Sequence, residues 1–280
     1  MMIKLISIDV DGTLLDNQGN LPPGNIAPIR AAKQNGIHII LNTGKPVSAI
    51  IDPYQTLALD DPVITLTGGL VLEKHGNHQW KRMRGSPIPV ASFDLIYQAI
   101  KDIKITTHFM TENLTYIHHV KNDPIYLEQF DDAMRKFSCL DYIVMPTSPL
   151  KCWQDLEMPP YKIMLFSEII DEVKQAWDAL NNVKIPGIIS EFSSPHTVDV
   201  RAVDSGKKNA IAFLCEKYGI NQSEVMALGD HESDMELIQW AGVGAFMSNG
   251  DAAMKAKAPL LAPSNDVCGV AVMIEKYALK

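Results

Sequence analysis

Near the N-terminus, apolar and polar positions fall into blocks that predict alternating strands and helices. The apolar, β-branched run 3–10 ends at the polar Asp11-Gly12-Thr13, which is typical of a buried strand running into a loop. Residues 26–35 carry apolar side chains at helical spacing and are followed by Gly36, a residue common just past helix ends. The run 37–41 then predicts a second buried strand.

The same alternation continues through the polar loop 42–45, a helix with Pro46 in its first turn, and a strand over 62–66 followed by Thr67-Gly68-Gly69. It returns after Lys207, with helices predicted over 208–218 and 234–240, strands over 225–228 and 243–246, and a loop over 229–233. Strands that alternate with helices imply a parallel sheet covered by helices on both faces. The predicted fold class is therefore α/β, with a doubly wound, Rossmann-like parallel sheet.

Between about Arg84 and Val198 the alternation loosens. The elements expected there are helices over 91–102, 125–137 and 169–181 and strands over 114–120, 162–166 and 196–200. This mixture predicts an α+β insert. The core domain is accordingly expected to be discontinuous, with residues 1–83 and 199–280 on either side of an inserted domain, 84–198.

Composition is that of an ordinary soluble domain, with 46% hydrophobic and 21% charged residues. The formal net charge of −8 argues against a nucleic-acid partner, which would favour clustered Lys and Arg. An acidic protein can still bind a small anion, because charge at the site decides. No run approaches the ~20 apolar residues of a membrane span. We expect a cytoplasmic protein, a monomer or homodimer.

The four cysteines, Cys139, Cys152, Cys215 and Cys268, show no metal-ligand spacing. They predict reduced thiols, and neither a zinc site nor a disulfide framework.

Two aspartates lie two residues apart where the first apolar run ends. In a strand that continues through both positions, Asp9 and Asp11 would point to one face and address one ion and one substrate. Gly12 allows a sharp turn. The alternative is a strand end in which an aspartate accepts hydrogen bonds from backbone amides.

A second acidic loop, Gly229 to Asp234, follows the apolar run 225–228. Its simplest interpretation is a helix start capped by Asp234. In a parallel sheet, however, this loop and the first one share an edge. Asp9, Asp11 and Asp230 would then converge on a hard cation such as Mg²⁺, which takes carboxylates, waters and phosphate oxygens.

Two further positions suit an anion. Thr43 offers a hydroxyl and a backbone amide after the second strand, and Gly44 keeps the backbone approachable. Lys207 begins a helix, where an ammonium opposes the helix dipole unless an anion is near. The alternatives are a solvated turn threonine and a solvated surface lysine, the latter because Lys208 is adjacent.

Taken together, these motifs resemble the four ordered motifs of the haloacid dehalogenase superfamily of phosphatases. The resemblance rests on Asp9 to Leu15, Thr43-Gly44, Lys207 and Gly229 to Asp234, with further matches at Met247-Ser248-Asn249, Ser264-Asn265 and Gly269-Val270. The insert resembles the type IIB cap of the Cof-type sugar-phosphatase subfamily. The likeness covers nearly the whole chain.

The resemblance implies a role for each matched residue. Asp9 would attack phosphorus and form an aspartyl-phosphate, and Asp11 would protonate the leaving oxygen and then activate water. Thr43, Gly44 and Lys207, with Asn249, would bind the substrate. Mg²⁺ would be held by Asp9, by the carbonyl of Asp11 and by Asp230, with Asp234 in support.

Four positions depart from the family pattern: Lys45 replaces a common Arg, Thr67 a common Asn, Lys208 a common Gly and Ser233 a common Asn. None removes a carboxylate, the threonine or the lysine, so the departures bear on supporting hydrogen bonds and on rate. In the insert, His108, His118, His119, Trp153 and Tyr161 suit substrate recognition, but packing or solvated positions are the simpler interpretation.

The expected function is Mg²⁺-dependent hydrolysis of small phosphate monoesters such as sugar phosphates. Two alternatives remain: a phosphosugar mutase of related fold, and a non-catalytic sensor of a phosphorylated metabolite.

Overall fold

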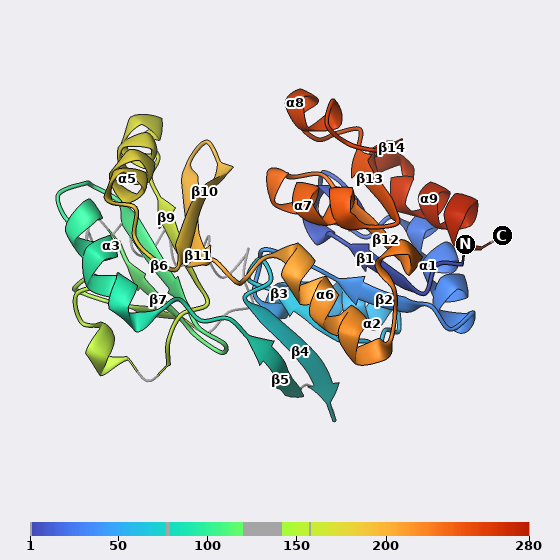
Figure 1. Cartoon of the computed structure of the whole chain (residues 1–280), viewed down its shortest axis with the longest axis horizontal. Coiled ribbons are helices and arrows are strands. Elements are labelled where there is room, and N and C mark those ends of the chain that lie inside the picture. The colour runs from blue at the N-terminus through green and yellow to red at the C-terminus, as the bar shows by residue number, and fades with distance from the viewer. Residues whose placement is uncertain (1, 77–78, 120–141, 157, 280) are drawn as a thin grey trace. The chain divides into compact units, whose positions relative to one another are not determined.

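The structure is a computed structural model that describes residues 2–76, 79–119, 142–156 and 158–279 (Figure 1). It divides into two compact units, Met1–Arg84 with Gly206–Lys280, and Gly85–Ser205. The helix expected over 125–137 and Cys139 lie outside the described residues. Among the described residues, Cys152, Cys215 and Cys268 are not joined by a disulfide bond.

The first unit is built on a parallel sheet whose strands follow the order β14-β13-β12-β1-β2. Its strands are β1 (Leu5–Ile8), β2 (His38–Leu41), β12 (Val225–Gly229), β13 (Val243–Met247) and β14 (Leu260–Ala262). β1 lies between β2 and β12, with Ile8 opposite both Leu41 and Leu228. The two halves of the sequence are thereby joined in the middle of one sheet, and the loops after β1, β2 and β12 emerge at the same edge.

Beyond β2, a parallel bridge joins Asn42 to Ile64 of β3 (Val63–Thr65). β3 also belongs to a three-stranded sheet with β4 (Leu70–His75) and β5 (Gln79–Gly85).

The helices of this unit are α1 (Pro23–Gln34), α2 (Ile51–Thr56), α6 (Lys207–Tyr218), α7 (Glu232–Trp240), α8 (Ala252–Lys255) and α9 (Gly269–Tyr277), with short 3₁₀ turns at Val47–Ile50, Gln222–Glu224 and Asn265–Val267. α6 and α7 pack on the sheet face that carries Leu5, Ile40 and Ala227. Alternate residues such as Ile6 point to the other face and are fully buried. α1 and α9 pack against each other. The predicted doubly wound parallel sheet is confirmed.

One prediction about this sheet is wrong. β1 ends at Ile8, and Val10–Leu14 forms a tight helical turn in which Gly12 has a φ of +74°. Asp9 and Asp11 therefore do not occupy alternate positions of one continuing strand. The apolar run 3–10 gave no signal of this, because Val10 is buried within the turn just as it would be within a strand.

The second unit is a six-stranded sheet of order β10-β11-β9-β6-β7-β8. Its strands are β6 (Thr106–Met110), β7 (Thr115–His118), β8 (Tyr142–Val144), β9 (Lys162–Phe166), β10 (Ile188–Ser194) and β11 (Thr197–Ala202). The helices are α3 (Phe93–Ile100), which follows a 3₁₀ turn at Val90–Ser92, and α5 (Ile170–Val183); a further 3₁₀ turn is Trp153–Asp155. α3 and α5 pack together over an apolar core that includes Phe109, Ile163 and Val198. The predicted α+β composition of this region is confirmed.

The sequence pattern did not predict β6 and β10, and burial explains why. All five residues of β6 are buried, so both faces of the strand are covered and its sequence does not alternate in polarity. β10 shows the opposite case, because all its residues are half-exposed. β11 pairs with β9 and β10 through Arg201 and so lies entirely in the second unit.

Among the helices of the described ranges, none has the length and apolar character that crossing a membrane requires.

Candidate active site

Asp9 is the first residue after β1 and is buried, with 7% of its surface exposed. Its backbone N–H donates to the Leu228 carbonyl at 3.0 Å, which ties it to the neighbouring strand β12. The tight turn that follows carries the chain away from the sheet. Asp9 is thus held at the carboxyl edge of the parallel strands, where ligands bind in open α/β sheets.

Asp230 and Asp234 come from the loop between β12 and α7. Asp234 is the third residue of α7, and its Oδ2 accepts the backbone N–H of His231 at 3.1 Å. The N-cap residue of this helix is His231, three residues before Asp234, so the expectation that Asp234 is the capping residue is wrong. Asp230 Oδ1 accepts the hydroxyl of Thr13 at 2.9 Å, a contact that joins the two acidic loops.

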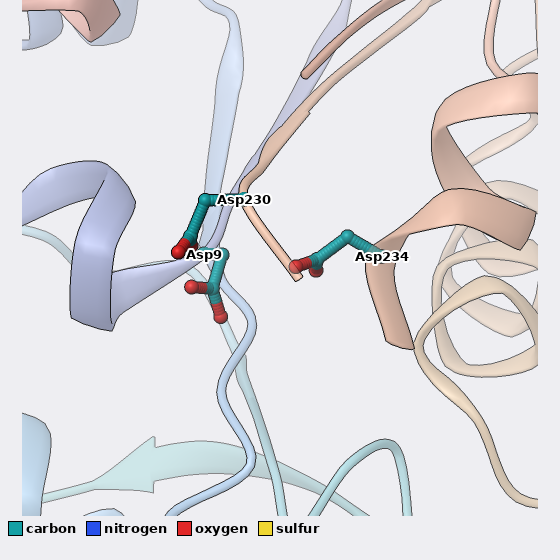
Figure 2. A group of neighbouring side chains, drawn as sticks. All are labelled: Asp9, Asp230 and Asp234. Atoms are coloured by element: carbon teal, nitrogen blue, oxygen red, sulfur yellow. The ribbon is translucent and has the colours of Figure 1, made fainter. Parts of the chain in front are cut away.

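Asp9, Asp230 and Asp234 gather around one point. Each offers a carboxylate oxygen, and these oxygens lie within 4.8 Å of one another. In Figure 2, Asp234 reaches from the start of its helix toward Asp9 and Asp230, which lie close together at the strand ends. Three acids drawn from opposite ends of the sequence therefore form one cluster.

Two glycines make this convergence sterically feasible. A Cβ on Gly12 would lie 2.2 Å from Asp230 Oδ2, and one on Gly229 would lie 2.3 Å from Asp234 Cγ. Real Cβ atoms do not approach other atoms so closely. Only glycine therefore fits at positions 12 and 229 while Asp230 and Asp234 keep their places. Gly12 also needs its positive φ, which glycine adopts without cost.

Lys207 lies between two of the acids. It is the first residue of α6 and only 3% exposed, and its Nζ donates to Asp9 Oδ1 at 2.5 Å and to Asp234 Oδ1 at 2.7 Å. An ammonium at a helix N-terminus opposes the helix dipole. The two carboxylates offset that cost and the cost of burial. The interpretation of Lys207 as a solvated lysine is wrong, whereas Lys208 pairs with the exposed Glu236 at the surface.

The cluster contains three carboxyl groups and one ammonium, so it has excess negative charge when all are ionised. Burial makes that excess charge unfavourable. Burial raises the pKa of Asp9 well above its ordinary value; Lys207 lowers it, and Asp234 and Asp230 raise it further. The pKa of Asp230 is raised chiefly by burial and by Asp234. Burial alone would lower the pKa of Lys207, but Asp234 and Asp9 together raise it above its usual range.

This donor set fits a divalent cation. Hard cations such as Mg²⁺ prefer carboxylate oxygens, and one ammonium leaves the three acids with excess negative charge to be balanced. Both oxygens of Asp234 already accept hydrogen bonds, from Lys207 and from His231. Asp9 and Asp230 are therefore the better placed direct ligands, and Asp234 orients the ammonium beside them.

Asp11 is not part of this cluster. Its carboxylate is half-exposed and forms an ion pair with Lys45 at 2.7 Å between Oδ1 and Nζ. Lys45, at a position where the sequence departs from the family pattern, thus has a direct partner in the first motif.

Thr43 is buried next to β2, and only one of its two expected anion donors remains. Its backbone N–H donates to the Ile64 carbonyl at 2.9 Å, so the expectation that this amide binds an anion is wrong. Its Oγ1 accepts the backbone N–H of Lys45 at 3.1 Å, which leaves the hydroxyl proton to donate. Gly44 lies between these two residues in the loop after β2.

Asn249 follows β13 and braces two loops. Its Nδ2 donates to the Gly12 carbonyl at 2.8 Å, and its Oδ1 accepts the backbone N–H of Asn265 at 3.2 Å. The amide retains a second N–H with which to reach a ligand. Asn249 therefore holds the turn that carries Gly12, a structural role that the sequence did not predict.

Some supporting residues were missed at the sequence level. Thr13 anchors Asp230, and Gly206 lies so close to Gly68 that a Cβ on Gly68 would meet its carbonyl oxygen at 2.2 Å. The Thr67-Gly68-Gly69 motif therefore positions the start of α6, and with it Lys207. Thr13 after Asp11-Gly12 and the pair Gly68-Gly69 are recognisable in the sequence. Their partners, Asp230 and Gly206, are distant in the sequence, so local pattern could not identify them.

The candidates in the insert all lie in the second unit. His108 and His119 are buried, and Trp153 packs edge-on against Phe93 with ring centroids 5.4 Å apart. Tyr161 is 3% exposed. Trp153 therefore has a packing role, which was the simpler interpretation.

Comparison with known proteins gives concordant findings. A sequence model described as haloacid dehalogenase-like hydrolase matches residues 6–274. The chain is 25% identical to a putative phosphatase, YxeH, of Bacillus subtilis, covering 99% of each chain. It is 24% identical to the pyridoxal phosphate phosphatase YbhA of Escherichia coli over all of both chains. Among solved structures, the subclass IIB sugar phosphatase BT4131 shares the fold with a TM-score of 0.79 at 20% identity, covering 98% of both chains.

Proposed function

The chain belongs to the haloacid dehalogenase-like hydrolase family, and we propose that it is a Mg²⁺-dependent phosphatase of small phosphorylated metabolites that uses Asp9 as its nucleophile. The observation that carries the proposal is the cluster of Asp9, Asp230 and Asp234 with Lys207 hydrogen-bonded to Asp9. Relatives that match the chain over their full length are named as phosphatases, one of them acting on pyridoxal phosphate.

The proposed ion would be held by Asp9, by Asp230 and by the backbone carbonyl of Asp11, with Asp234 in support. When bound, Mg²⁺ would offset the excess negative charge of the cluster and draw electron density from the phosphoryl oxygens. Lys207 supplies a second positive charge at the same place. This positive charge favours the approach of a doubly negative phosphate monoester to the Asp9 carboxylate.

In the first step, a carboxylate oxygen of Asp9 attacks phosphorus. The bond between phosphorus and the ester oxygen breaks, its electron pair goes to that oxygen, and the Asp11 carboxyl gives it a proton. The product alcohol leaves, and Asp9 carries an aspartyl-phosphate. For this role Asp11 must first give up its ion pair with Lys45 and take up a proton from solvent, which its half-exposed position at the surface permits.

In the second step, Asp11, now a carboxylate, takes a proton from water as the water oxygen attacks phosphorus. The bond to Asp9 breaks, inorganic phosphate leaves, and both aspartates return to their starting states. Covalent catalysis of this kind divides one hard displacement into two easier ones. The hydroxyl of Thr43, the loop at Gly44 and the ammonium of Lys207 hold the equatorial oxygens, where the charge is spread during transfer. Asn249 supports the same loop and offers its second N–H to the substrate.

We further propose that the second unit acts as the cap domain that selects the substrate, with the boundary near residue 84 and a return to the core between 199 and 206. Its separate core and its position within the sequence support this role. Sugar phosphates and pyridoxal phosphate are the first substrates to examine, because similar proteins carry those names. Cytoplasmic location and a monomeric or homodimeric state stay predictions.

The test is a screen of phosphorylated metabolites for release of inorganic phosphate, with and without Mg²⁺, using the wild-type chain and Asp9→Asn. We expect release only from the wild type with the metal present, ranked by kcat/KM. Isomerised phosphosugar without free phosphate would instead establish the mutase, and ligand binding without turnover would establish the sensor. Undiminished release by Asp9→Asn would refute the nucleophile.

A further inference from the structure

The second unit contains a pocket built entirely from its own residues, whereas the acidic cluster belongs entirely to the first unit. The pocket has a volume of about 220 Å³. Its walls are the end of α3 with the loop that follows, one residue each of β6 and β7, and the segment 146–151. The volume suits a metabolite of modest size, since sites for larger ligands range from about 300 to 1,000 Å³.

The charge of the pocket is positive. Lys101 and Lys151 line it, and the lining residues that the structure describes include no aspartate or glutamate. Neither lysine forms an ion pair with any residue that the structure describes. The carbonyl end of α3 also faces this region and contributes about half a negative charge, which two ammonium groups exceed. In a chain with a net charge of −8, two lysines with no acid among the described residues that line the pocket are a local exception that favours an anion.

Hydrogen-bonding groups lie beside the lysines. Thr107 lines the pocket, and within the described ranges its hydroxyl has no hydrogen-bond partner. This hydroxyl faces the pocket and can donate to or accept from a ligand oxygen. Ser148 and Thr147 add two more hydroxyls. Burial lowers the pKa of His118, so its imidazole is neutral and can donate one hydrogen bond and accept another.

The remaining wall is apolar. Ile100, Ile103 and Ile105 line it next to Tyr97. An inorganic anion would leave this surface unused, whereas an anion attached to an apolar or aromatic group would bury it and gain about 25 cal/mol per Å².

Backbone hydrogen bonds hold the walls in place. Met145 N–H donates to the Ile117 carbonyl at 2.6 Å and fixes the segment 146–151 beside β7. Lys151 N–H donates to the Ser148 carbonyl at 2.9 Å, so this lysine and this hydroxyl belong to one turn. A preformed site of this kind loses little entropy when it binds.

We propose that this pocket binds a small organic anion, a phosphate or carboxylate joined to an apolar group, as a second ligand site separate from the acidic cluster. The lysines and hydroxyls would hold the charged end, and the isoleucines the apolar end.

The test is calorimetric titration of the full chain, with Mg²⁺ present, using phenylphosphonate, benzoate and inorganic phosphate as probes. The acidic cluster can also bind a phosphoryl group, so each probe is compared among three proteins. These are the wild type, the pocket variant Lys101→Glu/Lys151→Glu, and the control Lys104→Glu/Lys174→Glu. The control makes the same change in net charge at exposed lysines of the same unit that do not line the pocket.

We expect the wild type and the control to share a binding step for phenylphosphonate or benzoate that weakens at least tenfold in the pocket variant. The probe that shows the step identifies the charged group as phosphoryl or carboxylate. Inorganic phosphate should bind this site several-fold more weakly, because it lacks the apolar group. Three outcomes would each overturn the proposal. The titrations could superimpose for all three proteins, the control could lose as much affinity as the pocket variant, or the wild type could bind neither organic probe at this site.

Discussion

The ammonium of Lys207 lies 2.5 Å from Oδ1 of Asp9, although 198 residues separate them in the sequence. The same ammonium donates to Asp234 at 2.7 Å, and all three side chains are buried. A single cation therefore joins the N-terminal strand to two helices from the far end of the chain. Stability and the proposed chemistry should both depend on it.

Replacing Lys207 by Met should destabilise the protein strongly. The substitution keeps most of the volume but leaves Asp9 and Asp234 buried without their cation, and breaking a buried pair in this way costs about 3 to 5 kcal/mol. Phosphate release should fall to background. The free energy of unfolding from urea titration and the phosphate-release assay measure the two effects.

The matched control is Lys208→Met, one residue along the same helix. Lys208 pairs with Glu236 at the surface, where such pairs contribute about 0 to 1 kcal/mol. If the two variants lost similar stability, the ammonium of Lys207 would not be what compensates the buried acids.

Gly12→Ala should reduce activity as well as stability. Alanine at this positive φ costs about 1 to 2 kcal/mol, and its Cβ would also displace Asp230, whose Oδ2 lies 2.2 Å from the required position. Gly36→Ala is the control, since Gly36 has a φ of +80° with nothing within 4 Å of the added Cβ. Both variants should lose stability, but only Gly12→Ala should lose kcat/KM. Full activity of Gly12→Ala would mean that Asp230 does not need its observed position.

The end of α5 offers a test of the second unit by itself. Lys184 follows the helix with a φ of +51°, a conformation that glycine adopts more easily than lysine. Relief of the left-handed strain, about 1 to 2 kcal/mol, exceeds the added entropy of the unfolded chain, so Lys184→Gly should stabilise the protein by about 0.5 to 1 kcal/mol. Lys174→Gly, the same replacement inside the helix, should destabilise it by about 1 kcal/mol. Thermal unfolding followed by circular dichroism should show opposite changes in Tm; a decrease for both would refute the role assigned to the left-handed position.

Stabilisation by Mg²⁺ should increase with pH. Burial and neighbouring acids raise the pKa of Asp9 and Asp230 in the folded chain. The metal-free protein therefore loses stability as pH rises from the unfolded value near 3.9 through these raised values, because the folded state must then carry unfavourable charges. Mg²⁺ relieves that charge and competes with protons for the same oxygens. The shift in Tm on adding Mg²⁺ should be larger at about pH 7.5 than at about pH 5. An equal or larger shift at the lower pH would contradict this linkage.

The sequence alone predicted the sheet and the elements that frame the site, because β1, β2 and β12 are short apolar runs that each end in polar residues. It also singled out Asp9, Asp230, Asp234 and Lys207. The convergence of Asp9 and Asp230 followed from topology, since the ends of parallel strands share an edge, whereas Asp234 and Lys207 were assigned to the site by the family resemblance.

The sequence did not predict how each side chain is used. Asp11 has the spacing of a strand neighbour of Asp9, yet Gly12 turns the chain and brings Asp11 to Lys45. The Thr43 amide is used by Ile64, because β3 continues the sheet beyond β2. Both outcomes depend on partners that are distant in the sequence, and local pattern carries no information about them.

The most direct test of the central claim is the affinity of the chain for Mg²⁺, measured by calorimetric titration for the wild type, Asp230→Asn and Asp11→Asn. Asp230→Asn removes a carboxylate of the cluster, whereas Asp11→Asn keeps the backbone carbonyl and alters only a side chain that pairs with Lys45. We predict one site in the wild type, a loss of affinity of about tenfold or more in Asp230→Asn, and nearly unchanged binding in Asp11→Asn. Equal binding by the wild type and Asp230→Asn would contradict the claim that acids from both ends of the chain hold one ion.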